Sequence, residues 1–397
     1  MTRDLLKMAI VLGLMSTLGP FAIDMYLPAL TTIAEDFRVD AASVQFTLTG
    51  YFIAFGVSQL FYGPASDMFG RKPPIYFGMA IFAAASIGAA FATSVEMLTA
   101  LRFVQGAGAA GVMSIPRAII RDRYTGSQAT RLMSTVMLVF SVSPMLAPLA
   151  GSAVIVPFGW RAVFLVLTIA TGFAALLMTF ALPETLLPER RTPFKFDVMF
   201  RNFGTLLRDP YYMGMTLIGG LGMSAFFTFL GSAPFIYMEV YGLSPTEFAI
   251  AFALNALGFF AATQFAATLM ARIGASRLIV LSSLGYGATT LLLLGVFLAG
   301  QGNLYSLVII LILGNLFMGL IIPSVMVMAL EAHGPIAGSA ASLGGTLQLL
   351  MGSLAMYVGA QAYDGTPVPM LWIVAGCGTG AAALALLTIR ERRPVAE

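Results

Sequence analysis

Charged residues, cysteine and histidine are scarce in this chain of 397 residues. Asp, Glu, Lys and Arg make up only 10% of it, whereas 59% of the residues are hydrophobic and the mean hydropathy is +0.90. A soluble domain carries roughly 25% charged residues, and so few charges cannot cover a water-facing surface of this size. The composition argues against an ordinary soluble protein and predicts one that is surrounded mostly by lipid.

The lack of cysteine and histidine removes several kinds of chemistry. Cys377 is the only cysteine and His333 the only histidine, so an intramolecular disulfide and a Cys/His metal cluster are both excluded. No lysine follows a glycine, which removes the phosphate-binding G-K-[ST] motif of ATP-driven proteins. We therefore expect no metal site, no cofactor, no catalytic activity and no nucleic-acid partner.

What the chain does have is a series of long apolar runs. A bilayer core of about 30 Å needs about 20 apolar residues per helix. The first run follows Arg3 and Lys7 as in a signal peptide, but it is too long and lacks a cleavage site, so we interpret it as a retained helix. We predict an all-α integral membrane protein with twelve spans, at about residues 5–28, 44–65, 73–92, 97–120, 131–156, 161–182, 212–238, 247–269, 276–299, 304–330, 336–360 and 369–389.

The basic residues predict the orientation of these spans. With a cytoplasmic N-terminus, 17 of the 21 Lys and Arg residues fall in cytoplasmic segments, and only Arg38 and Arg161 fall outside. Arg102 and Arg117 lie within the bilayer. This asymmetry is typical of an even number of spans. We expect a multi-pass protein of a bacterial inner membrane with both termini cytoplasmic.

One long connection, residues 183–211, divides the predicted spans into six and six. The sequence thus predicts a six-helix bundle at 1–182, a linker at 183–211 and a second bundle at 212–397. Within the linker, apolar residues recur at helical spacing, at Phe196, Met199, Phe200, Phe203 and Leu207. They indicate either a helix lying on the cytoplasmic membrane face or a simple tether.

The connection between the second and third runs carries a recognisable motif. Its sequence, Gly63-Pro64-Ala65-Ser66-Asp67-Met68-Phe69-Gly70-Arg71-Lys72, resembles the G-x-x-x-D-x-x-G-R-[KR] loop of the major facilitator superfamily. Glycines permit a tight turn, and Asp67 can accept hydrogen bonds from backbone N–H groups or an arginine. We expect Gly63, Asp67, Gly70 and Arg71 to form a conformational latch; the alternative is a charged hairpin that only sets orientation.

Two further motifs support this resemblance. The segment Leu101-Arg102-Phe103-Val104-Gln105-Gly106-Ala107-Gly108 looks like the superfamily's R-x-x-Q-G-x-G motif. It also fits the dinucleotide pattern G-x-G-x-x-G, but no strand precedes it. The segment from Ser143 to Gly151 resembles the Pro/Gly-rich motif of proton-driven exporters, although a kinked packing helix is an alternative.

Together with Phe21-Ala22-Ile23-Asp24-Met25-Tyr26-Leu27-Pro28-Ala29-Leu30, these motifs are similar to the Bcr/CflA branch of multidrug-resistance transporters. The resemblance covers nearly the whole chain. It implies two pseudo-symmetric six-helix bundles working by alternating access. It also implies export of drug-like compounds in exchange for protons.

Asp24 and Arg102 are the candidates for proton coupling. An ionisable residue in the bilayer costs about 2.5–3.5 kcal/mol on insertion scales, so it suggests function. Asp24 lies about four residues from the outer end of its predicted helix and Arg102 about five from the start of its own, which places both roughly 6–8 Å below the outer surface. The alternative is a static ion pair that only specifies packing.

The expected partners are small amphiphilic substrates, protons and the lipid bilayer, and we expect a functional monomer. Flat rings, thioethers and amides suit a site that accepts many shapes. The candidate substrate-binding residues are Thr17, Phe21, Asp24, Arg102, Met113, Phe140, Phe226, Phe229, Tyr237, Asn255, Asn315 and Gln348. Two other classes of function stay open at this point: uptake of a defined metabolite on the same fold, and a polytopic membrane enzyme or receptor.

Overall fold

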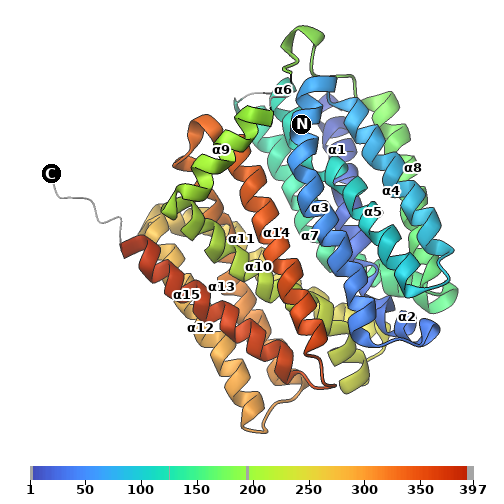
Figure 1. The fold of residues 1–397 in the computed structure, drawn as a ribbon, viewed down its shortest axis with the longest axis vertical. Helices are drawn as coiled ribbons and strands as arrows, with labels where there is room; N and C mark the ends of the chain where they lie inside the picture. The colour runs from blue at the N-terminus through green and yellow to red at the C-terminus, as the bar shows by residue number, and fades with distance from the viewer. Residues whose placement is uncertain (1–2, 125, 194–195, 391–397) are drawn as a thin grey trace. The chain divides into compact units, whose positions relative to one another are not determined.

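The structure, a computed structural model, describes residues 3–124, 126–193 and 196–390 (Figure 1). Within these residues all regular elements are helices, and twelve helical spans are long and apolar enough to cross a membrane. The predicted all-α class and the twelve spans are confirmed. The chain forms two compact units, Met1–Lys195 with Pro245–Ile250 and Phe196–Ser244 with Ala251–Glu397, called unit 1 and unit 2 below.

Unit 1 contains the first six spans. α3 packs against α5, α4 against both α5 and α8, and α1 against α7 and α8. The helices are α1 (Arg3–Asp24), η1 (Leu27–Ala29), α2 (Leu30–Phe37), α3 (Ala41–Phe69), α4 (Lys72–Ala90), α5 (Val95–Ser114), α6 (Pro116–Arg123), α7 (Gly126–Phe158), α8 (Arg161–Ala181) and η2 (Pro188–Arg190).

Unit 2 contains most of the remaining chain. α10 packs against α14, α15 and α13, and α12 packs against α15 and α13. The helices are α9 (Phe196–Arg208), α10 (Pro210–Pro234), η3 (Phe235–Val240), α11 (Pro245–Ile273), α12 (Ala275–Leu298), α13 (Leu304–Glu331), η4 (Gly334–Ile336), α14 (Ala337–Gln361) and α15 (Val368–Arg390), of which α11 begins within the residues assigned to unit 1.

The same pairs of helices pack together in both units, when each span of unit 1 is matched with the span six places later in the chain. The pairs α1–α7, α1–α8, α4–α8 and α4–α5 of unit 1 correspond to α10–α14, α10–α15, α12–α15 and α12–α13 of unit 2. Such repetition is the expected sign of two structural repeats. It confirms the pseudo-symmetric bundles, which residue identity between the halves was too weak to establish.

Two glycines let the fourth span approach its neighbours closely. A Cβ on Gly106 would lie 2.2 Å from the carbonyl oxygen of Tyr51 on α3, and one on Gly108 would lie 2.6 Å from that of Gly78 on α4. Both contacts are to backbone, which cannot move aside for a side chain. In lipid, helices associate through such close packing. The glycines of the R-x-x-Q-G-x-G motif therefore join α3, α4 and α5.

The first span is longer than the sequence indicated. Instead of ending near residue 28, it continues through η1 and α2 to Phe37. Pro28 lies in the first turn of η1, where its missing N–H is tolerated. Asp24 is consequently 13 residues from the end of the span, or roughly 20 Å at 1.5 Å per residue. Asp24 therefore lies further from the end of its span than the four residues that the sequence indicated.

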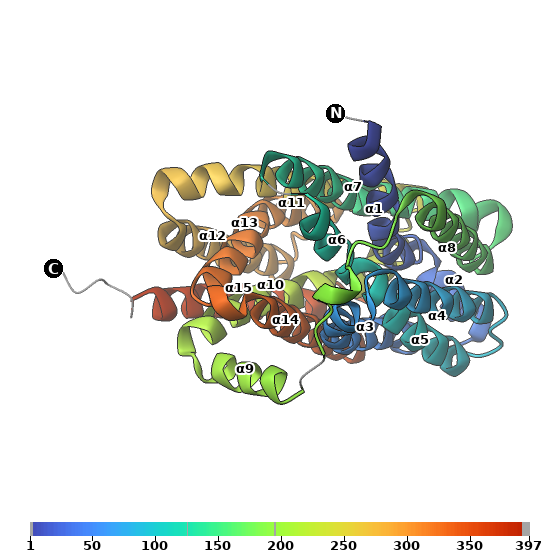
Figure 2. The same ribbon diagram turned by 90° about the horizontal axis from the view of Figure 1, so that it is seen from above.

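The linker contains the amphipathic helix that its apolar spacing predicted. α9 contacts α10 and α14, and Figure 2 shows it on the periphery of unit 2. Met199, Phe203 and Leu206 are buried, whereas Phe200 and Leu207 are exposed. One apolar face of the helix therefore packs against the bundle. The other, with Phe200 and Leu207, is exposed, and contact with lipid would be more favourable for it than contact with water.

The only histidine of the chain joins two turns of unit 2. The Asp209 carboxylate accepts hydrogen bonds from the N–H groups of Tyr211 and Tyr212 at the start of α10, at 2.8 and 3.3 Å. Its other oxygen lies 2.8 Å from Nε2 of His333, in the turn after α13. His333 therefore links the turn after α13 to the start of α10.

Candidate transport site and conformational latch

Arg102 lies at the centre of unit 1, in a cage of aromatic rings. Its side chain is fully buried, and its guanidinium carbon is 4.6 Å from the ring centroid of Tyr26, 4.5 Å from that of Tyr51 and 6.0 Å from that of Phe164. Ring faces attract a cation, by about 2 kcal/mol or more when water is excluded. The rings supply the stabilisation that a buried guanidinium needs.

Hydrogen bonds fix the orientation of Arg102. Nη1 donates to the carbonyl oxygen of Ala22 on α1, at 3.0 Å, and to Oε1 of Gln105 one turn along α5. Gln105 in turn donates to Ser86 on α4, at 2.7 Å. The Arg and Gln of the R-x-x-Q-G-x-G motif therefore bind α1, α4 and α5 together through one polar chain.

The guanidinium still has unused hydrogen-bonding capacity. Its Nε and Nη2 atoms are buried and have no hydrogen-bond partner in the described part of the chain. Buried donors are normally satisfied, so the N–H groups of these two nitrogens are available to a group that enters the cage.

Asp24 lies at the end of α1, two residues after the carbonyl that binds Arg102. Its side chain is only 5% exposed, and it is the one acidic residue among the buried side chains that the structure describes. None of the described ion pairs includes it. The alternative of a static Asp24–Arg102 ion pair is therefore wrong in this conformation, because Arg102 uses a carbonyl, an amide and ring faces instead.

The exporter-like motif of α7 reaches the same region. A Cβ on Gly151 would lie 2.3 Å from the carbonyl oxygen of Met25, the residue after Asp24. Gly151 is the last residue of the motif. At this position the backbone of α7 packs directly against the backbone of Met25, with no room for a side chain between them. Glycine at position 151 serves close packing rather than a turn, and it positions the segment that carries the acid.

The other unit 1 candidates are distributed along α1 and its neighbours. Thr17 is partly buried and donates to the carbonyl of Leu14, at 2.8 Å, and Phe21 is also partly buried. Met113 on α5 lies over Gly19, where a Cβ would be only 1.9 Å from its sulfur. Phe140 lies on α7, but its side chain is outside the described ones.

Five candidates of unit 2 come together in one cluster. The rings of Phe229 and Tyr237 meet edge to face at 6.3 Å. Asn255 on α11 donates to the hydroxyl of Tyr237, and Asn315 on α13 donates to Oδ1 of Asn255, both at 3.5 Å. Three helices thus contribute to a short polar chain beside an aromatic surface, which Phe226 extends.

A small cavity of about 10 Å³ borders this cluster, with room for about one water molecule. Phe226, Phe229 and Asn315 line it, and so do Tyr286, Thr289 and Thr290 of α12. The α12 residues were not among the predicted site residues. A periodic face of Tyr, Thr and Thr was the signal available. Gln348 lies elsewhere on α14, against Gly219 of α10.

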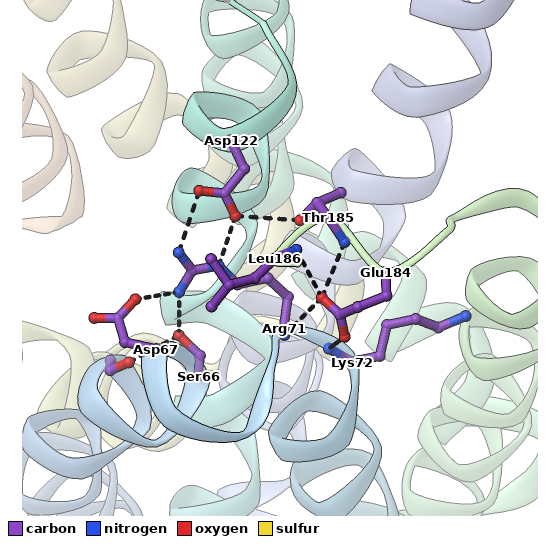
Figure 3. A network of polar contacts seen from close by, with 9 residues as sticks. Ser66, Asp67, Arg71, Lys72, Asp122, Glu184, Thr185 and Leu186 are labelled. Carbon is purple, nitrogen blue, oxygen red and sulfur yellow. Dashed lines mark hydrogen bonds and ion pairs between the residues drawn. The ribbon is translucent and has the colours of Figure 1, made fainter. Parts of the chain in front are cut away.

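Arg71, at the N-terminus of α4, organises the motif that spans the end of α3 and the turn into α4 (Figure 3). Its side chain is 7% exposed. It donates to both oxygens of Asp122 on α6, at 2.7 and 3.2 Å, to Asp67 on α3, and to Ser66 at 2.8 Å. Asp67 and Arg71 are one turn apart, so the contact that joins separate spans is the one with Asp122. The sequence analysis did not identify Asp122.

Glu184, just beyond α8, completes the network. Its carboxylate accepts hydrogen bonds from the N–H groups of Arg71, Lys72, Thr185 and Leu186, at 2.9 to 3.1 Å. Burial alone would raise the pKa of Glu184, but these N–H groups outweigh it and hold the pKa below its usual value. The ends of the second, fourth and sixth spans are thereby tied together around Arg71 (Figure 3).

The two glycines of the predicted latch differ in backbone conformation: Gly70 lies in the turn and Gly63 lies in a helix. Gly70 has φ of +96°, a conformation that favours glycine, and a Cβ there would lie 2.9 Å from Glu184. Gly63, by contrast, lies inside α3, which continues to Phe69, and a Cβ there would meet nothing within 4 Å. The expectation that both glycines form the turn is therefore wrong for Gly63.

Comparison with known proteins identifies the family. The Major Facilitator Superfamily model matches residues 12–356. The chain belongs to the Major Facilitator Superfamily. Its fold agrees with this assignment: a crystal structure of the nucleoside transporter NupG has a TM-score of 0.77 at 14% identity, covering 97% of this chain and 100% of that one.

Two curated superfamily members are similar over nearly the full length. An uncharacterized MFS-type transporter, YdgK of Bacillus subtilis, is 34% identical over 371 residues, which is 93% of this chain and 92% of that protein. A bicyclomycin resistance protein homolog of Haemophilus influenzae is 31% identical over 378 residues, with 93% and 92% covered. They confirm the resemblance to the Bcr/CflA branch that the motifs of this chain indicated.

Proposed function

We propose that this chain exports small amphiphilic, drug-like compounds across a bacterial inner membrane in exchange for protons. The observation that carries the proposal is Asp24. It is a buried acid within a membrane span, outside the described ion pairs, and close to Arg102 and to the exporter-like motif of α7. The name of the bicyclomycin resistance homolog supports drugs as the substrate class.

Asp24 is proposed as the proton carrier. A carboxylate is costly in an apolar interior unless it is neutralised, so Asp24 can hold a proton when shielded and release it when water or a cation approaches. Arg102, with two nitrogens that make no hydrogen bond in its cage, supplies a positive charge that can favour the released state. Proton and substrate then compete for one site, which is the thermodynamic basis of antiport.

The aromatic and amide cluster of unit 2 is proposed as part of the substrate site. Phe226 and Phe229 offer flat apolar surfaces, and Asn315 offers a donor and an acceptor beside the small cavity. Few directional groups and much apolar surface suit substrates of varied shape. In unit 1, Thr17, Phe21, Met113 and Phe140 are proposed for the same role.

The latch is proposed to control the exchange between conformations. Arg71, Asp67 and Gly70 act with Asp122 and Glu184, which join three span ends. Breaking these contacts changes the relative stability of conformational states more than it changes substrate contacts.

Further parts of the proposal concern organisation. The cytoplasmic placement of both termini rests on the distribution of Lys and Arg. We propose bundles at 1–182 and 212–397 joined by a linker at 183–211, a functional monomer, and transport driven by the proton gradient without a cofactor, an enzymatic step or nucleic acid.

The test uses inside-out membrane vesicles that contain the protein and have an acidified lumen. An antiporter should concentrate a labelled drug such as chloramphenicol in the lumen, and dissipation of the proton gradient should release it. Accumulation only in right-side-out vesicles with acid outside would instead support proton-coupled uptake, and no gradient-dependent movement in either orientation would contradict both.

A further inference from the structure

An open cavity of about 440 Å³ lies in unit 1, beside the network of Arg71. Three cations line it, each from a different helix: Lys7 of α1, Lys72 of α4 and Arg123 of α6. The end of α8 and the residues after it, 179–183, form the remaining wall together with Met8. None of the described residues that line the cavity is acidic.

No carboxylate in the described part of the chain forms an ion pair with the three cations. Within the described part of the chain, Lys7, Lys72 and Arg123 take part in no ion pair. Lys72 uses one N–H, which donates to the carbonyl of Leu182 at 2.9 Å, and its ammonium lies 5.7 Å from the centre of the Tyr76 ring. Two further N–H groups of Lys72 are therefore available to an anion.

Two described acids next to these residues in sequence or structure are already occupied. Asp122, next to Arg123 in sequence, accepts hydrogen bonds from Arg71 and Thr185. Glu184 accepts its hydrogen bonds from backbone N–H groups, two of which belong to Arg71 and Lys72. Among the described side chains, no carboxylate therefore compensates the charge of Lys7, Lys72 and Arg123 at the cavity, and three cations lining one cavity favour a phosphate-type anion.

An apolar stripe on α8 leads to the same cavity. Its residues follow one another at helical spacing on one face, and their exposed fractions are high. They are Ile169 at 72%, Phe173 at 56%, Leu176 at 58% and Phe180 at 82%. Phe180 belongs both to the stripe and to the cavity wall. A ligand that fits cations at one end and an apolar helix face at the other is an amphiphile with an anionic head.

We propose that this cavity binds the headgroup phosphate of an anionic phospholipid, whose acyl chains lie along the α8 stripe. Free phosphate would satisfy the cations but not the stripe, and a zwitterionic lipid would bring its own cation into a cavity that already holds three. The occupant is therefore a membrane lipid of net negative charge, bound at the end of unit 1 that carries the latch.

The test is native mass spectrometry of the purified full-length protein in neutral detergent, titrated with phosphatidylglycerol or phosphatidylcholine. Wild type should retain phosphatidylglycerol preferentially. In K7Q/K72Q/R123Q its affinity should fall about fivefold for each cation removed, or roughly a hundredfold in all. The control R131Q/R272Q/R277Q removes the same charge from positions outside the cavity and should bind as wild type does.

Three outcomes would overturn the proposal. They are equal binding of phosphatidylglycerol by the cavity variant and the control, equal retention of the two lipids by wild type, and displacement of phosphatidylglycerol by inorganic phosphate at the same concentration. The last would identify a free-anion site instead of a lipid site. If the triple variant does not fold, Arg123→Gln alone, at an exposed position, should still show the fivefold loss.

Discussion

The guanidinium of Arg71 holds both carboxylate oxygens of Asp122, with Nε 2.7 Å from Oδ2 and Nη2 3.2 Å from Oδ1. Asp67 also contacts Arg71, but the two acids differ in exposure: the Asp122 side chain is 18% exposed and that of Asp67 is 52% exposed. An exposed pair contributes about 0–1 kcal/mol, whereas loss of one partner from a shielded pair costs more.

We therefore expect Asp122→Asn to destabilise the protein by about 2 kcal/mol and Asp67→Asn by less than about 1 kcal/mol. Both should slow transport more than they weaken equilibrium substrate binding, because both act on conformational states. Thermal unfolding in detergent, substrate affinity and transport rate are the measurements. A larger stability loss for Asp67→Asn, or binding lost in proportion to transport, would contradict the latch.

Glu184 makes stability depend on acid pH. Because its pKa in the folded protein lies below the usual value, the unfolded chain takes up the proton first, at about pH 4.3. The stabilisation is fully present above that pH and is lost as the pH falls through the folded-state pKa. The difference in melting temperature between wild type and Glu184→Gln should be largest near pH 7 and shrink below about pH 4. Glu189→Gln, which removes a carboxylate at an exposed position, is the matched control.

Asp24→Asn keeps the shape of the side chain and removes its titration. We expect it to abolish proton-driven accumulation of drug while downhill exchange of a neutral substrate continues, because only coupling needs the proton. Vesicle transport with and without a pH gradient distinguishes the two activities. If Asp24→Asn still concentrates drug with unchanged pH dependence, another group carries the proton.

Gly106→Ala places a methyl group where only 2.2 Å separates it from the Tyr51 carbonyl. Forced separation of α3 and α5 should lower stability by about 1–3 kcal/mol. Gly172→Ala on α8 is the control, since a Cβ there meets nothing within 4 Å, and it should be neutral or slightly stabilising. Equal melting temperatures for the two variants would show that α3 and α5 do not pack as described.

Asn315→Leu should change which drugs are exported. It removes a donor and an acceptor from the wall of the unit 2 cavity without shortening the side chain. Substrates that hydrogen-bond there should lose about 1 kcal/mol, or roughly fivefold in affinity, while apolar substrates should be unaffected. Resistance profiles of cells that express each protein test this. Asn303→Leu, at a helix cap on the chain's surface, serves as a control for general loss of stability.

The twelve spans, the motifs and the amphipathic α9 were readable from the sequence because each depends on residues close together in the chain. A run of about 20 apolar residues must become a helix in lipid, where no water can satisfy the backbone. Gly70 and Arg71 could be placed at a turn for the same local reason. One local pattern gave a wrong boundary: the span was predicted to end at Pro28, but its helices continue to Phe37.

The partners within the site were decided only by the tertiary structure. A static ion pair of Arg102 with Asp24 stayed open as an alternative because the two charges were expected at matching depth, but depth says nothing about which face of a helix carries a side chain. The folded unit gives Arg102 the rings of Tyr26 and Tyr51. Likewise, Arg71 meets Asp122 and Glu184 across 51 and 113 residues. Hydropathy specifies that a segment crosses the membrane. Which side chains it contacts depends on how each helix is rotated about its axis and on close packing at glycines such as Gly106 and Gly151.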